Sequence, residues 1–194
     1  MPTKSTSSFD AKEILTAEFE YIASSATQAN EDRARVSSFY LVAVGSLIAA
    51  LFSTQLLDKD TNPRAASLLF SGLFFILTLL GSLTVTQLAR LRAAWYESML
   101  ALNQIKEYTI SKEKDLAKAF RWRLKTLPPL HKPNSISYQQ TLEVALLSGL
   151  TFGASVFFLQ QAFFQITALT WIISVIFGIL GLYLQTVIYK RSLK

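Results

Sequence analysis

The polar residues with the clearest spacing in this sequence lie inside an otherwise apolar tract. Thr78, Ser82 and Thr86 follow one another at four-residue intervals, and Gln87 stands beside the last of them. Hydroxyl and amide groups in this pattern can hydrogen-bond one helix to another, or line a water-filled path through a bilayer. Neither role involves bond-making chemistry, so the stripe predicts helix packing or conduction.

The side chains that most enzymes need are missing or isolated. The chain has no cysteine, and its single histidine, His131, lies in a Pro-rich stretch. The serines at positions 5–8 have no histidine neighbour, and nearly all of the 7 glycines fall in apolar tracts, which leaves no Gly-rich phosphate loop. We therefore expect no enzymatic activity, no catalytic residue, no metal site and no cofactor.

A second pattern consists of small residues four positions apart within the apolar tracts. Small side chains let helix backbones approach closely, and in lipid this packing replaces the missing hydrophobic drive. Such faces serve either packing within the chain or contact between subunits, and the sequence leaves both open. The residues are Gly45, Ala49 and Ser53 in the first tract, Ala145, Gly149 and Gly153 in the third, and Ser174 and Gly178 in the fourth.

Both patterns lie in long tracts without charge. Residues 36–57, 65–89 and 144–189 contain no Asp, Glu, Lys or Arg. About 20 apolar residues at about 1.5 Å rise each cross a bilayer, so the first two tracts supply one span apiece. The third is long enough for two spans and is interrupted at Gln160, Gln161 and Gln165, where we predict a turn.

The sequence therefore predicts an all-α integral membrane protein with four transmembrane helices, near residues 36–57, 65–89, 138–160 and 169–189. Only 16% of the residues are charged, against about a quarter in ordinary soluble domains. A soluble helical bundle is the alternative, but uncharged runs of this length are hard to cover by packing in so small a chain.

Basic residues indicate the orientation. All of the 19 Lys and Arg residues except Lys59 and Arg64 fall in segments that four spans would place on one side of the membrane. By the positive-inside rule this side is cytoplasmic, so we expect both termini in the cytoplasm. Because topology accounts for the net charge of +6, the expected partner is the lipid bilayer and not nucleic acid.

Two of the spans are predicted to continue outside the membrane as helices, over about 10–57 and 64–109. Each continuation carries a narrow apolar seam, and the short loop between the two spans makes the helices antiparallel neighbours. We expect the seams to pair in a cytoplasmic stalk. The seam residues are Leu15, Phe19 and Ile22 on the first helix, and Leu91, Trp95, Leu102 and Ile105 on the second.

The remaining segments are short. We predict a disordered N-terminus over 1–9, a basic amphipathic helix over 111–127 capped by Ser111, a Pro-rich connector over 128–137 and a basic tail over 190–194. The amphipathic helix packs on the stalk, or lies in the headgroup plane with Trp122 as its anchor. The acidic segment 1–35 and the basic segment 90–143 have opposite net charges, which favours their docking.

Without catalytic features, the chain is expected to act through its spans. The leading hypothesis is a homo-oligomer that works as a channel, pore or membrane-perturbing effector coupled to the stalk. The alternative is a structural or adaptor protein that holds a cytoplasmic protein partner on the stalk. The layout looks like that of small bacterial membrane effectors in nucleotide-signalling and phage-defence systems, which implies the bacterial inner membrane; no site residue is carried over from them.

Overall fold

Four long α-helices form most of the computed structural model, which describes residues 11–53 and 62–193. They are α1 (Ala11–Ser53), α2 (Pro63–Lys112), α3 (Ile136–Phe163) and α4 (Ala168–Ser192). Each is long and apolar enough to cross a membrane, and the described ranges contain no β-strand. The prediction of an all-α chain with four candidate membrane spans is confirmed.

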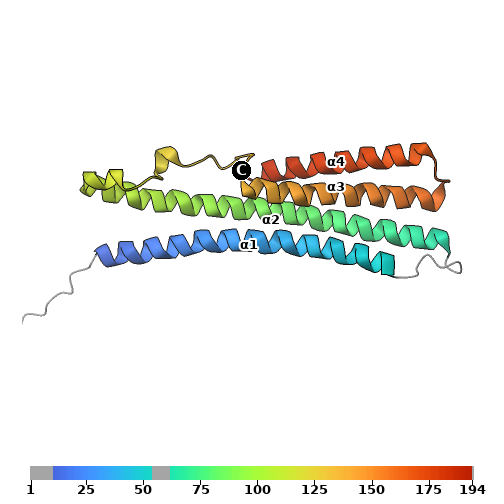
Figure 1. Cartoon of the computed structure of the whole chain (residues 1–194), viewed down its shortest axis with the longest axis horizontal. Coiled ribbons are helices and arrows are strands. Elements are labelled where there is room, and N and C mark those ends of the chain that lie inside the picture. Colours follow the sequence, from blue (N-terminus) through green and yellow to red (C-terminus); the bar gives the residue numbers. More distant parts are fainter. Residues whose placement is uncertain (1–10, 54–61, 194) are drawn as a thin grey trace, which may run out of the picture.

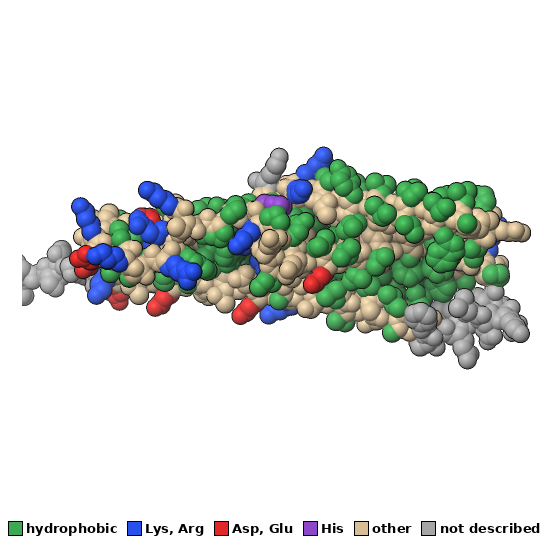
Figure 2. Space-filling view, turned by 45° about the horizontal axis from the view of Figure 1, so that its top comes forward, with side chains coloured by type: hydrophobic (Ala, Val, Ile, Leu, Met, Phe, Trp, Pro, Cys, Tyr) green, Lys and Arg blue, Asp and Glu red, His purple; other side chains and the backbone are tan. Residues whose placement is uncertain are grey.

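α2 lies at the centre of the bundle. α1 runs antiparallel along one side of it, while α3 and α4 form a hairpin on the other side (Figure 1). α1 and α2 also extend beyond the hairpin, and we call residues 11–32 and 93–112 the projecting end. Charged side chains gather over this end, whereas apolar side chains cover most of the remainder (Figure 2).

Local sequence sets the helix starts. The side chain of Asn62 accepts a hydrogen bond from the backbone N–H of Arg64 at 3.0 Å, and Pro63 follows at the first helical position. The Ser135 side chain caps α3 by accepting from the backbone N–H of Tyr138 at 3.3 Å. These caps explain why α2 and α3 begin slightly before the predicted residues 64 and 138.

Some sequence predictions fall on parts of the chain outside the described residues. These are the disordered segment 1–9, the helix start at Asp10, the helix end over 54–57, and the last residue of the tail, Lys194. The predicted fourth span, 169–189, lies within α4, which continues through most of the predicted basic tail to Ser192.

The segment predicted as one helix over 111–127 differs in the structure. It contains two short 3-10 helices, η1 (Lys114–Lys118) and η2 (Leu124–Thr126), both packed on α2. Arg123, which lies in the apolar arc of the predicted helix, instead binds Glu107 of α2 through two hydrogen bonds of 2.9 and 2.6 Å. Ser111 remains inside α2, where its hydroxyl donates to the Tyr108 carbonyl at 2.6 Å.

The apolar core lies around α2, where α1 and α3 meet it. Leu88, Val85 and Val144 are fully buried there, and Phe158 of α3 stacks on Phe74 of α2 with ring centroids 5.7 Å apart. α1 and α4 bury much less of their apolar surface than α2 does. Exposed Leu, Ile and Phe side chains on these outer helices are suited to contact with lipid chains.

Candidate functional site

The small residues of α3 and α4 bring these two helices into backbone contact. A Cβ atom placed on Gly149 would lie 2.8 Å from the Gly178 carbonyl oxygen, and one on Gly153 would lie 2.8 Å from the Ser174 carbonyl oxygen. No side chain larger than hydrogen fits at either position without a shift of backbone. Ala145 is buried on the same helix, so the predicted faces on α3 and α4 meet each other within one chain.

The small face of α1 is arranged differently. Gly45 and Ala49 are exposed, and a Cβ atom on Gly45 would meet nothing within 4 Å. The side chain of Ser53 lies outside the described residues. The described chain therefore leaves this face uncovered, in contrast to the glycines of α3.

The predicted polar stripe of α2 turns partly inward and joins a cluster to which all four helices contribute. The Thr78 and Thr151 hydroxyls lie 3.0 Å apart, and the Ser148 hydroxyl donates to the Thr78 carbonyl at 3.2 Å. From α4, the Gln185 amide nitrogen donates to the Ser82 and Ser148 hydroxyls at 2.7 and 2.8 Å.

α1 joins this cluster through Tyr40, whose hydroxyl donates to the Leu77 carbonyl at 3.3 Å. Gly81 makes the cluster possible, since a Cβ there would lie 2.6 Å from the Ser148 side chain and 2.8 Å from the Tyr40 hydroxyl. Gln185 is only 2% exposed, and its Oε1 has no hydrogen-bond partner in the described part of the chain. One buried acceptor is thus available to a further donor.

The other stripe residues play smaller parts. Thr86 donates to the Ser82 carbonyl in its own helix at 2.9 Å, and Gln87 is exposed. A further polar contact joins Ser71 and Ser155, each of which donates to the other's carbonyl at 2.9 Å. Within the stripe, Thr78 and Ser82 thus bind α2 to α3 and α4, whereas, among the described residues, Thr86 and Gln87 make no hydrogen bond to another helix.

Sequence reasoning missed the α3 half of these contacts. Ser148, Thr151 and Ser155 are all buried and lie at intervals of three and four residues. This is the spacing of one helix face. The same argument that picked out Thr78 and Ser82 would have found these residues.

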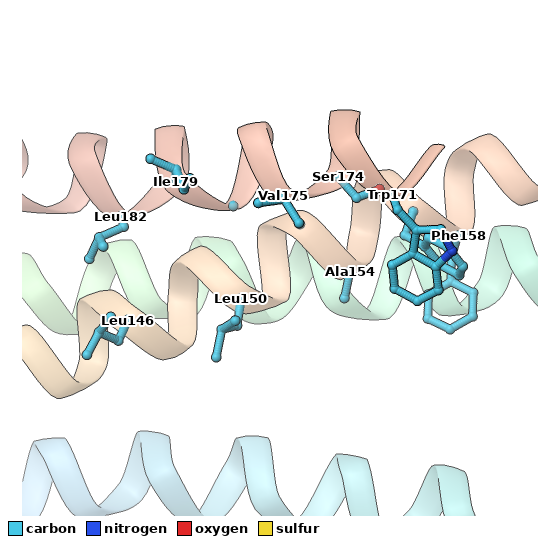
Figure 3. A pocket seen from close by; sticks show the side chains of 12 residues that line it. Leu146, Leu150, Ala154, Phe158, Trp171, Ser174, Val175, Ile179 and Leu182 are labelled. Carbon is cyan, nitrogen blue, oxygen red and sulfur yellow. The ribbon is translucent and has the colours of Figure 1, made fainter. Parts of the chain in front are cut away.

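Two apolar grooves run along α3. One, of about 570 Å³, is lined by residues of α3 and α4 that include Leu150, Ala154, Val175 and Ile179, with Trp171 and Phe158 at one end (Figure 3). The other, of about 410 Å³, is bounded by α1, α2 and α3. Both grooves are lined almost entirely by apolar side chains, so their chemistry suits hydrocarbon chains.

The predicted seams of α1 and α2 are only partly closed. Leu102 is buried, Phe19 is exposed, and the rest of the predicted seam is half-buried, namely Leu15, Ile22, Leu91, Trp95 and Ile105. Ala26, Ala29 and Asn103 are more deeply buried than most of the seam. α1 and α2 pack along these faces, with small residues of α1 at the tightest positions.

Electrostatic pairing at the projecting end is local. The Arg123 guanidinium, through its hydrogen bonds and charge, lowers the pKa of Glu107 and so holds η2 on α2. In α1, Asp32 pairs with Arg35 at 3.4 Å. α1 packs along α2, but the part of the basic segment that holds η1 and η2 does not pack against α1 (Figure 1), and among the described residues no ion pair joins the acidic segment to the basic one.

Two arginines are buried where the hairpin ends and the projecting end begins. Arg33 of α1 is 6% exposed and Arg92 of α2 is 5% exposed. Burial, and next the charge of Arg92, lower the pKa of Arg33, while burial lowers that of Arg92. Their spacing does not distinguish them from other basic residues beside a span, which ordinarily lie in the headgroup layer.

No protein family, curated protein or solved structure matches this chain. Among residues 11–53 and 62–193, no three His, Asp or Glu side chains lie together as a metal-binding group.

Proposed function

We propose that this protein is a non-enzymatic membrane protein that self-associates and acts through its spans as a channel, pore or membrane-perturbing effector. The projecting end is its cytoplasmic stalk, which couples assembly to a signal. One observation carries the proposal: among residues 11–53 and 62–193, α1 packs against only one side of the bundle, and both its small-residue face and its acidic face stay open.

Within the membrane, the open face is that of Gly45 and Ala49. Glycine in a lipid-facing helix contributes no side-chain contact of its own, whereas it permits a second helix to approach closely. The same residue type on α3 is used for such an approach to α4, at Gly149 and Gly153. A neighbouring copy is the simplest occupant for the α1 face.

Outside the membrane, the open faces have complementary charge. Glu13, Glu18, Glu20 and Glu31 of α1 are exposed, and so are Lys112, Lys114, Lys118, Arg121 and Lys125 on and after α2. Because these two sets do not meet within the described chain, one copy offers its acids to the basic segment of the next. Both contacts involve α1, so a single arrangement can satisfy them.

The polar cluster restricts how such an assembly would conduct. Thr78 and Ser82 are hydrogen-bonded inside one bundle, so a wet path is expected between copies and not through a single copy. Only Gln87 of the stripe is exposed and free to line that path.

Subunit counting tests the proposal. Full-length protein in nanodiscs or mild detergent is examined by native mass spectrometry, and an oligomer is expected. Gly45→Leu should raise the monomer fraction, whereas Gly72→Leu should not, because Gly72 is equally open but lies on α2. A strictly monomeric wild-type protein would overturn self-association and the pore together.

The alternative function is a membrane-anchored adaptor. The exposed apolar residues Ile14 and Tyr21 lie among the acids of α1, where a soluble partner can dock. Ion and dye flux through vesicles containing the protein separates the two functions. Flux supports the effector, while absence of flux together with stoichiometric co-purification of a soluble protein supports the adaptor.

A further inference from the structure

Arg33 and Arg92 are buried, and no carboxylate in the described part of the chain pairs with either of them. Among the described residues, neither has an Asp or Glu oxygen within 4 Å; the ion pairs there are Arg35–Asp32 and Arg123–Glu107. After burial, the charge of Arg92 is the next cause that lowers the pKa of Arg33. Two like charges therefore share one buried region.

The contacts of these arginines are neutral and incomplete. Arg33 donates to the side-chain oxygens of Asn30 at 3.2 Å and Gln140 at 3.3 Å, and its buried Nε has no acceptor. Arg92 donates from Nε to the Leu130 carbonyl at 3.2 Å, and its guanidinium lies 4.3 Å from the Trp95 ring centroid. Most of their N–H groups remain available to an anion.

Burying such a pair is unfavourable unless something negative accompanies it. Arginine stays protonated in proteins even when its pKa is lowered, so both guanidinium groups keep their charge. An isolated buried charge costs several kcal/mol, and a second like charge adds to the cost. The residues that bear on the pair electrostatically are tyrosines, Tyr189 for both and Tyr96 for Arg92, and not carboxylates.

A cleft of mixed polar and apolar lining lies beside this region. It has a volume of about 430 Å³ and is lined by Leu130, His131, Lys190 and Leu193. Leu130 also supplies the carbonyl that Arg92 binds, and the buried Tyr189 lies beside His131, with ring centroids 6.4 Å apart. The cleft adds an exposed lysine to the two buried arginines.

The position of these residues along the chain identifies the anion. Arg33 precedes the first uncharged tract, Arg92 follows the second, and Lys190 follows the last. When the four spans cross a bilayer, all three lie at the level of the lipid headgroups on one side. The abundant anions at that level are the phosphates of acidic phospholipids, which are concentrated in the cytoplasmic leaflet.

We propose that Arg33 and Arg92 bind the phosphate group of an anionic phospholipid, which reaches them past His131 and Lys190. A guanidinium group presents paired donors that match phosphate oxygens, and two of them can hold one phosphate from two helices. A choline headgroup carries its own positive charge and is disfavoured beside three cations. The site joins α1 to α2 through the lipid, independently of self-association.

Lipid selection by the full-length protein tests this site. Nanodiscs are made with equal amounts of phosphatidylcholine and phosphatidylglycerol, and the lipids retained by the released protein are counted by native mass spectrometry. The wild type is expected to retain phosphatidylglycerol preferentially. Arg33→Gln and Arg92→Gln should each reduce that preference about tenfold, the size expected from one lost charge-assisted contact.

Each variant has a matched control two residues away. Arg35→Gln and Arg90→Gln remove exposed arginines of the same helices and should leave the preference unchanged. An equal loss in these controls would show that general surface charge attracts the lipid, and would overturn the site. If the wild-type protein retained both lipids equally, that result alone would overturn the proposed site.

Two further experiments complete the test. The first distinguishes binding of a phospholipid from binding of a free anion, and the second distinguishes a loss of lipid binding from a loss of folding. Inorganic phosphate is added to the detergent-solubilised protein, and no rise in Tm is expected, in contrast to the rise with phosphatidylglycerol. If phosphate stabilises the protein as well and displaces the lipid, the lipid assignment is wrong. Arg33→Lys and Arg92→Lys retain the charge for folding but lose the paired donors, so reduced lipid preference in these variants also supports the site.

Discussion

Gly81 of α2 lies so close to Ser148 of α3 that a Cβ atom on the glycine would stand 2.6 Å from the Cβ and Oγ atoms of the serine. This approach allows the Ser148 hydroxyl to reach the Thr78 carbonyl and the Gln185 amide. The polar cluster between the spans therefore depends on a missing side chain.

Gly81→Ala should destabilise the bundle. The new methyl group has to displace Ser148 or Tyr40, and overpacking of this kind costs about 1–3 kcal/mol. Thermal unfolding in nanodiscs, followed by circular dichroism, measures the loss. Gly72→Ala is the control, because a Cβ on Gly72 meets nothing within 4 Å; a similar Tm for both variants would contradict the close contact.

The Ser71–Ser155 contact should give a measurable coupling energy. Each hydroxyl donates to the carbonyl of the opposite helix at 2.9 Å, and polar contacts between membrane helices average about 0.6 kcal/mol with a maximum near 1.7. A double-mutant cycle of Ser71→Ala and Ser155→Ala is expected to fall in this range. The same cycle with Ser71→Ala and Ser98→Ala should give none, since Ser98 bonds only within α2.

Docking of η2 on α2 should weaken in acid. The folded-state pKa of Glu107 is lowered by Arg123, so this carboxylate stabilises the docked state above its unfolded pKa, about 4.3. The contribution is lost as the pH falls through the lowered folded value. Fluorescence anisotropy of a Trp122-only protein, made with Trp95→Phe and Trp171→Phe, follows the release; Glu107→Gln should abolish the acid transition, while Glu113→Gln should preserve it.

Charge reversal on the projecting end should control assembly. Glu18→Lys with Glu20→Lys is expected to raise the monomer fraction, because it places like charges opposite the basic segment of a neighbouring copy. Adding Lys114→Glu and Lys118→Glu should restore the oligomer. Raised salt should weaken the wild-type contact in the same assay. If none of these changes alters the oligomeric state, the interface between copies lies elsewhere.

Much of the fold could be predicted because it depends on local composition. The uncharged tracts located the four helices, and capping residues such as Ser135 account for small differences in their starts. The segment 111–127 could not be predicted in the same way, since its shape depends on Arg123 meeting Glu107, a contact between side chains 16 residues apart. Local periodicity contains no information about that pairing.

The candidate site was predictable only as a set of faces. Spacing identified Gly45 and Gly149 as members of small-residue faces, but not that Gly149 packs inside the chain while Gly45 stays open. That difference depends on the rotation of each helix about its axis, which the neighbouring helices determine. Arg33 and Arg92 were missed for the same reason, since rotation turns them inward while Arg35 and Arg90 face outward.

The two apolar grooves on α3 share one wall. Leu150, Ala154 and Phe158 line both the groove facing α4 and the groove facing α1 and α2. Because these side chains border both grooves, a shift of any of them changes the shape of both grooves at once. An acyl chain bound in the groove beside α4 would therefore change how α1 packs on α3. Through this one row of side chains, the thickness or saturation of the surrounding bilayer would affect the packing of α1.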